Sequence, residues 1–152
     1  MSDLKQQLKG VFGFPVTPLK DDLSLDLPAL EKVIESMLAH PFCAIVVTGG
    51  TGEVYSLTAD ESVSVVERAA KVVNGRVPIV AGVGYNTEIG SDMARRMEKA
   101  GADALLVMPP YYINAPEAGL FAYYKTIGQA SGLPLSLYSR DWAVFTPDQV
   151  AR

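Results

Sequence analysis

The sequence predicts an α/β fold built around a parallel β-sheet. Short apolar runs alternate with longer amphipathic stretches along the 152 residues, a pattern typical of repeated strand–helix units. The apolar runs are rich in Val, Ile, Leu and Ala without alternation, as expected of strands that are covered on both faces. The five predicted strands are Val11 to Val16, Cys43 to Thr48, Pro78 to Ala81, Asp103 to Met108 and Pro134 to Tyr138.

Helix start signals and helical periodicity predict four complete helices between these strands. Asp26 is expected to cap the first helix, and Thr58 with Glu61 to form a capping box at the second. The third helix spans about residues 87–100 and the fourth about residues 116–130. The apolar side chains expected to face the sheet are Leu27, Leu30, Ile34, Met37 and Leu38 in the first helix, Val63, Val66, Ala70 and Val73 in the second, Ile89, Met93 and Met97 in the third, and Leu120, Tyr124 and Ile127 in the fourth.

A fifth helix begins near the last residue, and it bears on the architecture. Thr146, Pro147 and Gln149 supply an N-cap, a proline at the first helical position and a second capping box. Strand starts recur at intervals of about 30 residues, and eight such units give the roughly 250 residues of a (β/α)₈ TIM barrel. The chain then forms one domain, residues 1–152, that covers about five units of a barrel truncated on its C-terminal side. A complete doubly wound five-stranded domain fits these residues about equally well.

Composition and charge argue against several classes of protein. Thirteen Lys and Arg against seventeen Asp and Glu give a net charge of −4, which disfavours nucleic acid as a partner. No apolar run reaches the roughly 20 residues of a membrane-spanning helix, so we expect a cytoplasmic protein without membrane contact. Cys43 and His40 are the only residues of their types, so no disulfide, metal site or serine–histidine triad is expected.

The loops that follow the strands hold the candidate binding residues, because both α/β architectures place their sites there. Loop 14–18 reads F-P-V-T-P and is interpreted as a rigid strand exit. Loop 48–53 reads T-G-G-T-G-E, and its three glycines expose backbone N–H groups that suit a carboxylate or a phosphate. A plain tight turn with Glu53 in solvent is the alternative. The third loop, A-G-V-G-Y-N-T, leads into a helix cap at Thr87.

Tyrosines dominate the last two loops. M-P-P-Y-Y contains Tyr111 and Tyr112, and L-Y-S-R-D places Tyr138 at the end of the fifth strand. A buried Tyr138 hydroxyl needs a hydrogen-bond partner, which Thr51 is placed to supply. The residues of these loops predict a pocket that binds a small anion and in which a tyrosine transfers protons. A nucleophile is missing, since Lys20, near the first strand exit, is assigned to the surface.

In this order, F-P-V-T-P, G-G-T-G-E, A-G-V-G, P-P-Y-Y and L-Y-S-R-D resemble the dihydrodipicolinate synthase and N-acetylneuraminate lyase superfamily. The resemblance spans essentially the whole chain and implies a (β/α)₈ barrel that binds a 2-keto acid as a lysine imine. F-P-V-T-P together with Y-S-R-D-W-A-V-F is most similar to the 5-dehydro-4-deoxyglucarate dehydratases. That branch implies a lyase, acting without a cofactor, that converts a keto-diacid to 2,5-dioxopentanoate with loss of water and carbon dioxide.

The resemblance also implies roles for individual residues. Tyr138 becomes the proton relay at the imine, and Thr51 the hydroxyl that orients it. The backbone and hydroxyl donors of Gly49, Gly50 and Thr51 would hold the 1-carboxylate of the substrate. Arg140 is the candidate for binding the far carboxylate.

Two departures from the superfamily pattern disfavour a synthase or a sialic-acid lyase. Many relatives have threonine where Gly50 stands, and the aldolase-type members have arginine where this chain has Ala143. Another keto-acid aldolase or synthase of the superfamily remains an alternative. A non-catalytic five-stranded binding module is a second alternative, favoured by length.

Two further expectations follow from the resemblance. Tyr112 matches a catalytic tyrosine that relatives place across a dimer interface into the neighbour's pocket, which implies a homodimer or a homotetramer. The imine lysine of relatives follows the sixth strand, and the chain ends before that point. The 152-residue chain alone is therefore expected to be inactive.

Overall fold

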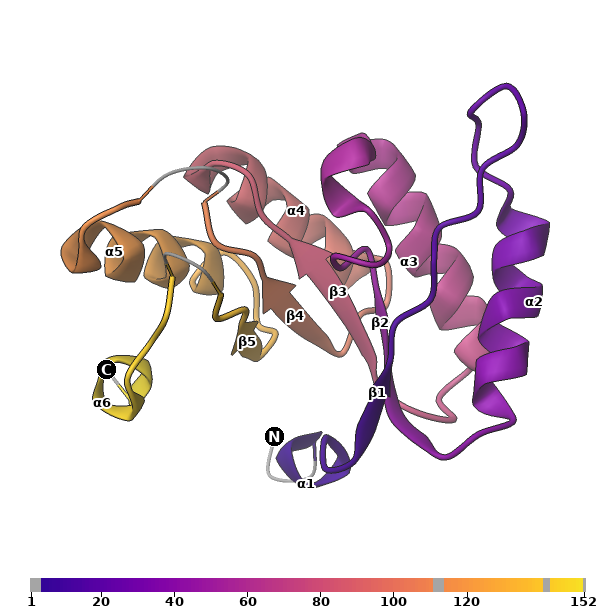
Figure 1. Cartoon of the computed structure of the whole chain (residues 1–152), viewed down its shortest axis with the longest axis horizontal. Helices are drawn as coiled ribbons and strands as arrows, with labels where there is room; N and C mark the ends of the chain where they lie inside the picture. The colour runs from indigo at the N-terminus through magenta and orange to yellow at the C-terminus, as the bar shows by residue number, and fades with distance from the viewer. Residues whose placement is uncertain (1–3, 111–113, 141–142, 152) are drawn as a thin grey trace.

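Five parallel strands form one curled sheet in the computed structural model, which describes residues 4–110, 114–140 and 143–151 (Figure 1). The order in the sheet is β1-β2-β3-β4-β5, the same as the order along the chain. A doubly wound sheet reverses its strand order at a switch point, whereas a barrel adds each strand next to the previous one. The described residues therefore form part of a barrel. The strands are β1 (Val11–Gly13), β2 (Phe42–Val47), β3 (Ile79–Val83), β4 (Ala104–Val107) and β5 (Leu135–Leu137).

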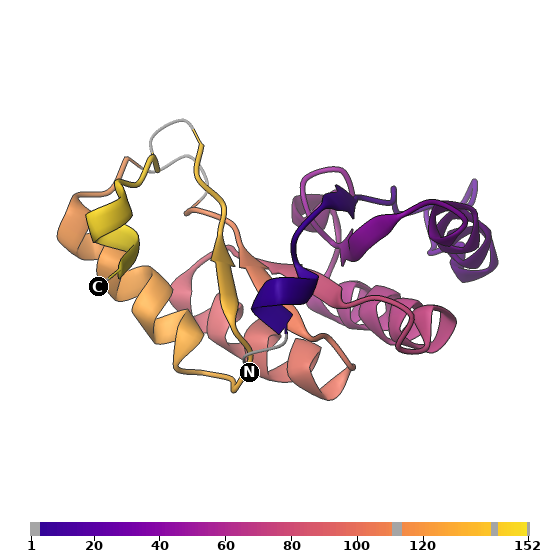
Figure 2. The same cartoon turned by 90° about the horizontal axis from the view of Figure 1, so that it is seen from below.

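The long helices cover the convex face of this sheet, as the view from below shows (Figure 2). Helix α1 lies near the end of the sheet at which the strands begin (Figure 1). The structure adds two short elements that the periodicity did not predict, α1 and the 3₁₀-helix η1. The helices are α1 (Leu4–Gln7), α2 (Leu27–Leu38), η1 (Val54–Ser56), α3 (Ala59–Val73), α4 (Thr87–Lys99), α5 (Glu117–Gly128) and α6 (Pro147–Ala151).

Each predicted strand is present, but burial on both faces applies only to the middle of the sheet. All residues of β3 and β4 are buried. In β5 every residue is only half-buried, and in β1 the side chain of Val11 is 65% exposed. These two strands are the edges of the described sheet, where a strand has one neighbour instead of two.

Capping chemistry starts three helices where the sequence predicts them. The Asp26 carboxylate accepts from the Ala29 amide at 2.9 Å. At α3 the Glu61 amide donates to the Thr58 hydroxyl at 3.2 Å, and the Thr58 amide donates to the Glu61 carboxylate at 2.9 Å. The same reciprocal pair joins Thr146 and Gln149 at α6.

The predicted cap of α4 at Thr87 is wrong by one residue. Asn86 has the extended N-cap backbone, and its side-chain oxygen accepts from the Ile89 amide at 2.8 Å. Thr87 is then the first helical residue. Asparagine is among the strongest N-cap residues, so it takes the position ahead of the threonine that follows it.

The buried face of α3 is rotated from the predicted one. Val66 and Val73 are buried as expected, whereas Val63 and Ala70 are only partly buried. Val65 and Ala69 take part in the core in their place. Helix α3 packs against α2 on one side and α4 on the other, so its contacts with neighbouring helices shift the buried strip. In α4, the predicted core residue Ile89 is 41% exposed.

Gly82 in β3 provides a direct test of the packing. A Cβ atom built on Gly82 would lie 1.9 Å from the carbonyl oxygen of Thr48, which is backbone and has little room to move. We expect Gly82→Ala to lower the free energy of unfolding by roughly 3 kcal/mol, the upper end of the usual cost of overpacking. Urea denaturation measures this loss.

Gly50 supplies the matched control for stability. A Cβ atom built there meets nothing within 4 Å, so Gly50→Ala should change the free energy of unfolding by less than about 0.5 kcal/mol. Equal stability of the two variants would contradict the tight contact between Gly82 and Thr48.

Candidate functional site

The loops that follow the five strands gather at one edge of the sheet, because parallel strands all end on the same side (Figure 1). The segment 48–53 after β2 makes the sharpest turn at this edge. Thr48 is fully buried with a φ of 51°, in the left-handed region. Its hydroxyl donates to the carbonyl oxygen of Gly82 in β3 at 3.1 Å. The turn is therefore fixed onto the neighbouring strand, a role for Thr48 that the sequence did not predict.

The glycine loop, residues 49–53, closes through its own carbonyl groups. The Val54 amide donates to Gly49 at 3.2 Å, and the Glu53 amide donates to Gly50 at 3.1 Å. Gly49 is buried, while Gly50 and Thr51 are exposed. Within the described residues, no hydrogen bond uses the amide N–H groups of Gly50 and Thr51. Two adjacent backbone donors are thus available to an anion, as the glycine pattern predicts.

A second loop residue holds the glycine loop from the side of β1. The Thr17 hydroxyl donates to the carbonyl oxygen of Gly52 at 2.8 Å. Thr17 belongs to the F-P-V-T-P motif, which the sequence indicated only as a rigid exit from β1. Lys20 lies farther along this loop and is exposed, in agreement with its assignment to the surface.

Tyr138 directly follows β5 and extends its pairing with β4. Its amide donates to the carbonyl oxygen of Val107 at 3.1 Å, and its side chain is half-buried against the core. No hydrogen bond joins the hydroxyls of Tyr138 and Thr51 in the part of the chain that the structure describes. The role of Thr51 in orienting Tyr138 stays a prediction.

Arg140 lies at the exit from β5, two residues beyond Tyr138. Its backbone pairs with Ala143 in an antiparallel bridge, with N–H···O distances of 3.1 and 2.8 Å. Arg140 is exposed and Ala143 is fully buried. The predicted interface residue Tyr112 lies outside the described residues, as does its neighbour Tyr111.

Three other tyrosines connect the loops at this edge, and the sequence did not single them out. The Tyr85 hydroxyl lies 2.5 Å from the carbonyl oxygen of Val54 and 3.1 Å from that of Leu57. The Tyr55 hydroxyl donates to Pro109 at 3.1 Å. These bonds join η1, which follows the glycine loop, to the loops that follow β3 and β4.

Tyr123 in α5 completes this set of contacts. Its hydroxyl lies 3.1 Å from the carbonyl oxygen of Met108 and 3.3 Å from that of Tyr85. Burial raises the pKa of Tyr123 well above the usual tyrosine value, and burial also raises the pKa of Tyr85. Both hydroxyls therefore remain protonated donors near neutral pH.

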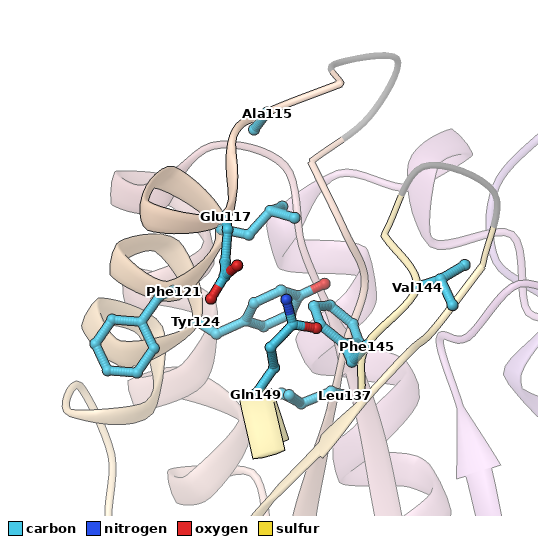
Figure 3. Close-up of a pocket in the computed structure, with 9 residues that line it drawn as sticks. Ala115, Glu117, Phe121, Tyr124, Leu137, Val144, Phe145 and Gln149 are labelled. Carbon is cyan, nitrogen blue, oxygen red and sulfur yellow. The ribbon is translucent and has the colours of Figure 1, made fainter. Parts of the chain in front are cut away.

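A cavity of about 220 Å³ lies between α5, β5 and α6 (Figure 3). Ala115 from the loop after β4, and Val144 and Phe145 from the loop after β5, line part of it. The rings of Tyr124 and Phe145 meet edge to face there, with centroids 5.4 Å apart. The buried Tyr124 hydroxyl has no hydrogen-bond partner among the described residues. None of the predicted site residues that the structure describes lines this cavity, so it is separate from the glycine loop.

The described part of the strand-end edge contains backbone amides, hydroxyl groups and the guanidinium group of Arg140. Over residues 4–110, 114–140 and 143–151, no group of three or more His, Cys, Asp or Glu side chains is placed to hold a metal ion. Among the helices of these same segments, none combines the length and the apolar character that crossing a bilayer requires. The donors that the described edge does present suit a small carboxylate.

Sequence comparison relates the chain to a known protein family. The chain matches the dihydrodipicolinate synthetase family over residues 7–152. It is 40% identical over 143 residues to a Bradyrhizobium sp. (strain ORS 278) protein named "Probable 5-dehydro-4-deoxyglucarate dehydratase", covering 94% of this chain and 46% of that protein. A protein of the same name from Rhizobium rhizogenes is 41% identical, with 94% and 47% covered. The chain thus spans about half the length of the curated relatives it matches.

Solved structures confirm the fold. Dihydrodipicolinate synthase from Bacillus anthracis superposes with a TM-score of 0.87 at 31% identity, covering 93% of this chain and 50% of that one. Dihydrodipicolinate synthase from Agrobacterium tumefaciens gives a TM-score of 0.89 at 28% identity, with 97% and 51% covered. The five strands correspond to five of the eight strands of a (β/α)₈ barrel, so the predicted fold class is right and the doubly wound alternative is wrong.

The raised pKa of Tyr123 predicts how stability depends on pH. The unfolded chain binds the phenolic proton with a pKa of about 10, and the folded chain binds it more tightly. The contribution of this proton to the free energy of unfolding is therefore fully present below about pH 10. It is lost as the pH rises toward the higher pKa of Tyr123 in the folded chain. Urea denaturation from pH 8 to 11 should show the free energy of unfolding falling above pH 10. Tyr123→Phe should fall less steeply, and an unchanged slope would contradict the assignment.

Proposed function

Because the chain belongs to the dihydrodipicolinate synthetase family, we propose that it forms the substrate-cradling half of a lyase that acts on a 2-keto acid. The observation that carries this proposal is the pair of uncommitted amides at Gly50 and Thr51. They lie at the strand-end edge of a barrel, where enzymes of this fold bind their substrates. In this assignment Gly49, Gly50 and Thr51 hold the carboxylate next to the keto group, which is the 1-carboxylate when the substrate is numbered as a 2-keto acid.

The proposed substrate is 5-dehydro-4-deoxyglucarate. Uptake of one proton and loss of one water and one carbon dioxide convert this keto-diacid dianion to 2,5-dioxopentanoate, which balances atoms and charge. The names of relatives 40 and 41% identical to this chain support the choice. Glycine at position 50, where many superfamily members have threonine, favours this reaction over a synthase reaction.

The proposed chemistry proceeds through an imine between the substrate and a lysine. In relatives this lysine follows the sixth strand. The residues of this chain bind the substrate carboxylates and transfer protons. Tyr138 moves protons at the reacting carbon, Thr51 orients its hydroxyl, and Arg140 pairs with the far carboxylate.

The proposal includes an assembly and a location. Tyr112 reaches across a dimer interface into the pocket of a second copy, so the enzyme works as a homodimer or homotetramer. The net charge of −4 suits a cytoplasmic enzyme that handles a small acid and binds no nucleic acid.

Tyr138→Phe tests the proton relay in the protein expressed from its natural gene. Removing the hydroxyl should lower kcat by about 100-fold, the scale of lost general acid–base catalysis. Formation of 2,5-dioxopentanoate from the keto-diacid is the readout. Tyr124→Phe is the control, since that hydroxyl lies at the cavity outside the site. Near-normal turnover by Tyr138→Phe would exclude the role.

Borohydride trapping tests where the nucleophile lies. The polypeptide of residues 1–152, mixed with pyruvate and sodium borohydride, should gain no mass, because the imine lysine lies elsewhere. Mass spectrometry of the intact polypeptide detects any adduct. A stoichiometric adduct would show that one of the lysines of this chain forms the imine.

A further inference from the structure

We propose that Tyr55, Tyr85 and Tyr123 are positioning residues, which hold the glycine loop in the shape that grips the substrate carboxylate. The proposal rests on the proposed function of that loop. The three side chains come from η1, from the loop after β3 and from α5. None of them carries a donor assigned to the substrate.

Tyr85 fixes the segment that leaves the glycine loop. Its hydroxyl is shared between the carbonyl oxygens of Val54 and Leu57, at 2.5 and 3.1 Å, and so spans η1. The Val54 amide in turn donates to the carbonyl oxygen of Gly49. Tyr85 is therefore connected through Val54 to Gly49, the first residue of the glycine loop.

The backbone at Tyr85 indicates that this geometry is imposed. Its φ is 71°, in the left-handed region that a bulky residue rarely adopts. Such a conformation is strained and persists only where surrounding contacts determine it. The edge-to-face contact between the Tyr55 and Tyr85 rings, with centroids 5.0 Å apart, is one of those contacts.

Tyr55 links the same segment to the loop after β4. Its hydroxyl donates to the carbonyl oxygen of Pro109 at 3.1 Å. Gly84 makes room for it, since a Cβ atom there would lie 3.2 Å from the Tyr55 hydroxyl oxygen. This bond connects the segment after the glycine loop to the loop after β4.

Tyr123 closes the set from the helix side. Its buried hydroxyl contacts the carbonyl oxygens of Met108 and Tyr85, at 3.1 and 3.3 Å. One side chain thus joins the backbones of the third and fourth loops. The three hydroxyls make a continuous brace across the loops that follow β2, β3 and β4.

Kinetics of the protein expressed from its natural gene test this brace. Tyr85→Phe and Tyr55→Phe each remove one hydroxyl and keep the ring. A single hydrogen bond of ordinary strength predicts that each variant raises KM for the keto-diacid by about three- to tenfold. We expect kcat to change less than about twofold, because Tyr138 is untouched.

Tyr124→Phe is the matched control. It removes a buried hydroxyl from the residue next to Tyr123, and that hydroxyl bonds no loop in the described structure. KM and kcat should both match those of the unsubstituted protein. A general loss of stability would affect all three variants, whereas loss of the brace affects only two.

Amide hydrogen exchange provides the second readout. Tyr85→Phe should speed exchange at Glu53 and Val54, whose amides close the glycine loop, and Tyr124→Phe should not. Unchanged exchange in both Tyr85→Phe and Tyr55→Phe would overturn the brace. Faster exchange with an unchanged KM would overturn the positioning role. If the unsubstituted protein fails to convert the keto-diacid, the proposed function falls, and the exchange comparison still decides whether the brace exists.

Discussion

The close approach between Gly82 and the backbone of Thr48 is the constraint on which the strand-end edge depends. The carbonyl oxygen of Thr48 occupies the space that a side chain at position 82 would fill. Thr48 turns through a left-handed conformation and bonds its hydroxyl to Gly82. The chain that leaves β2 therefore crosses toward β3 at Gly82. The glycine loop follows directly and lies at the strand-end edge of the sheet.

The sequential order of the strands determines what surrounds that loop. Each βα unit adds its strand beside the previous one, so consecutive strand-end loops are neighbours. The hydroxyl groups of Tyr55 and Tyr85 therefore bond to backbone carbonyls only one or two strand-end loops away. The same order leaves β1 and β5 as edges of the described sheet, where burial is incomplete. In a closed barrel each of these strands has a second neighbour.

Local signals in the sequence predicted the elements well. A capping box spans three residues, so both the box at Thr58 and the box at Thr146 are readable without knowledge of the fold. The error at Thr87 arose because two capping residues are adjacent there. The face of α3 was misplaced because its burial is decided by α2 and α4, which lie elsewhere in the chain.

The hydrogen bonds that shape the candidate site could not be predicted in this way. Thr17 bonds a residue 35 positions away, and Tyr55 bonds one 54 positions away. Nothing in the local pattern distinguishes these hydroxyls from ordinary loop or core residues. The glycine loop itself was identifiable, since its function depends on composition and on its place after a strand. The residues that hold it became evident only with the register of the sheet.

These long-range bonds also bear on the proposal that Tyr138 is the proton relay. The hydroxyls of Tyr55, Tyr85 and Tyr123 are committed to carbonyl oxygens, and burial holds the last two protonated. Tyr124 lines the cavity between α5, β5 and α6. Tyr138 directly follows β5, and its hydroxyl makes no hydrogen bond to a carbonyl oxygen within the described residues. A relay must exchange its proton with substrate, so among the tyrosines that the structure describes Tyr138 is the one suited to the proposed task.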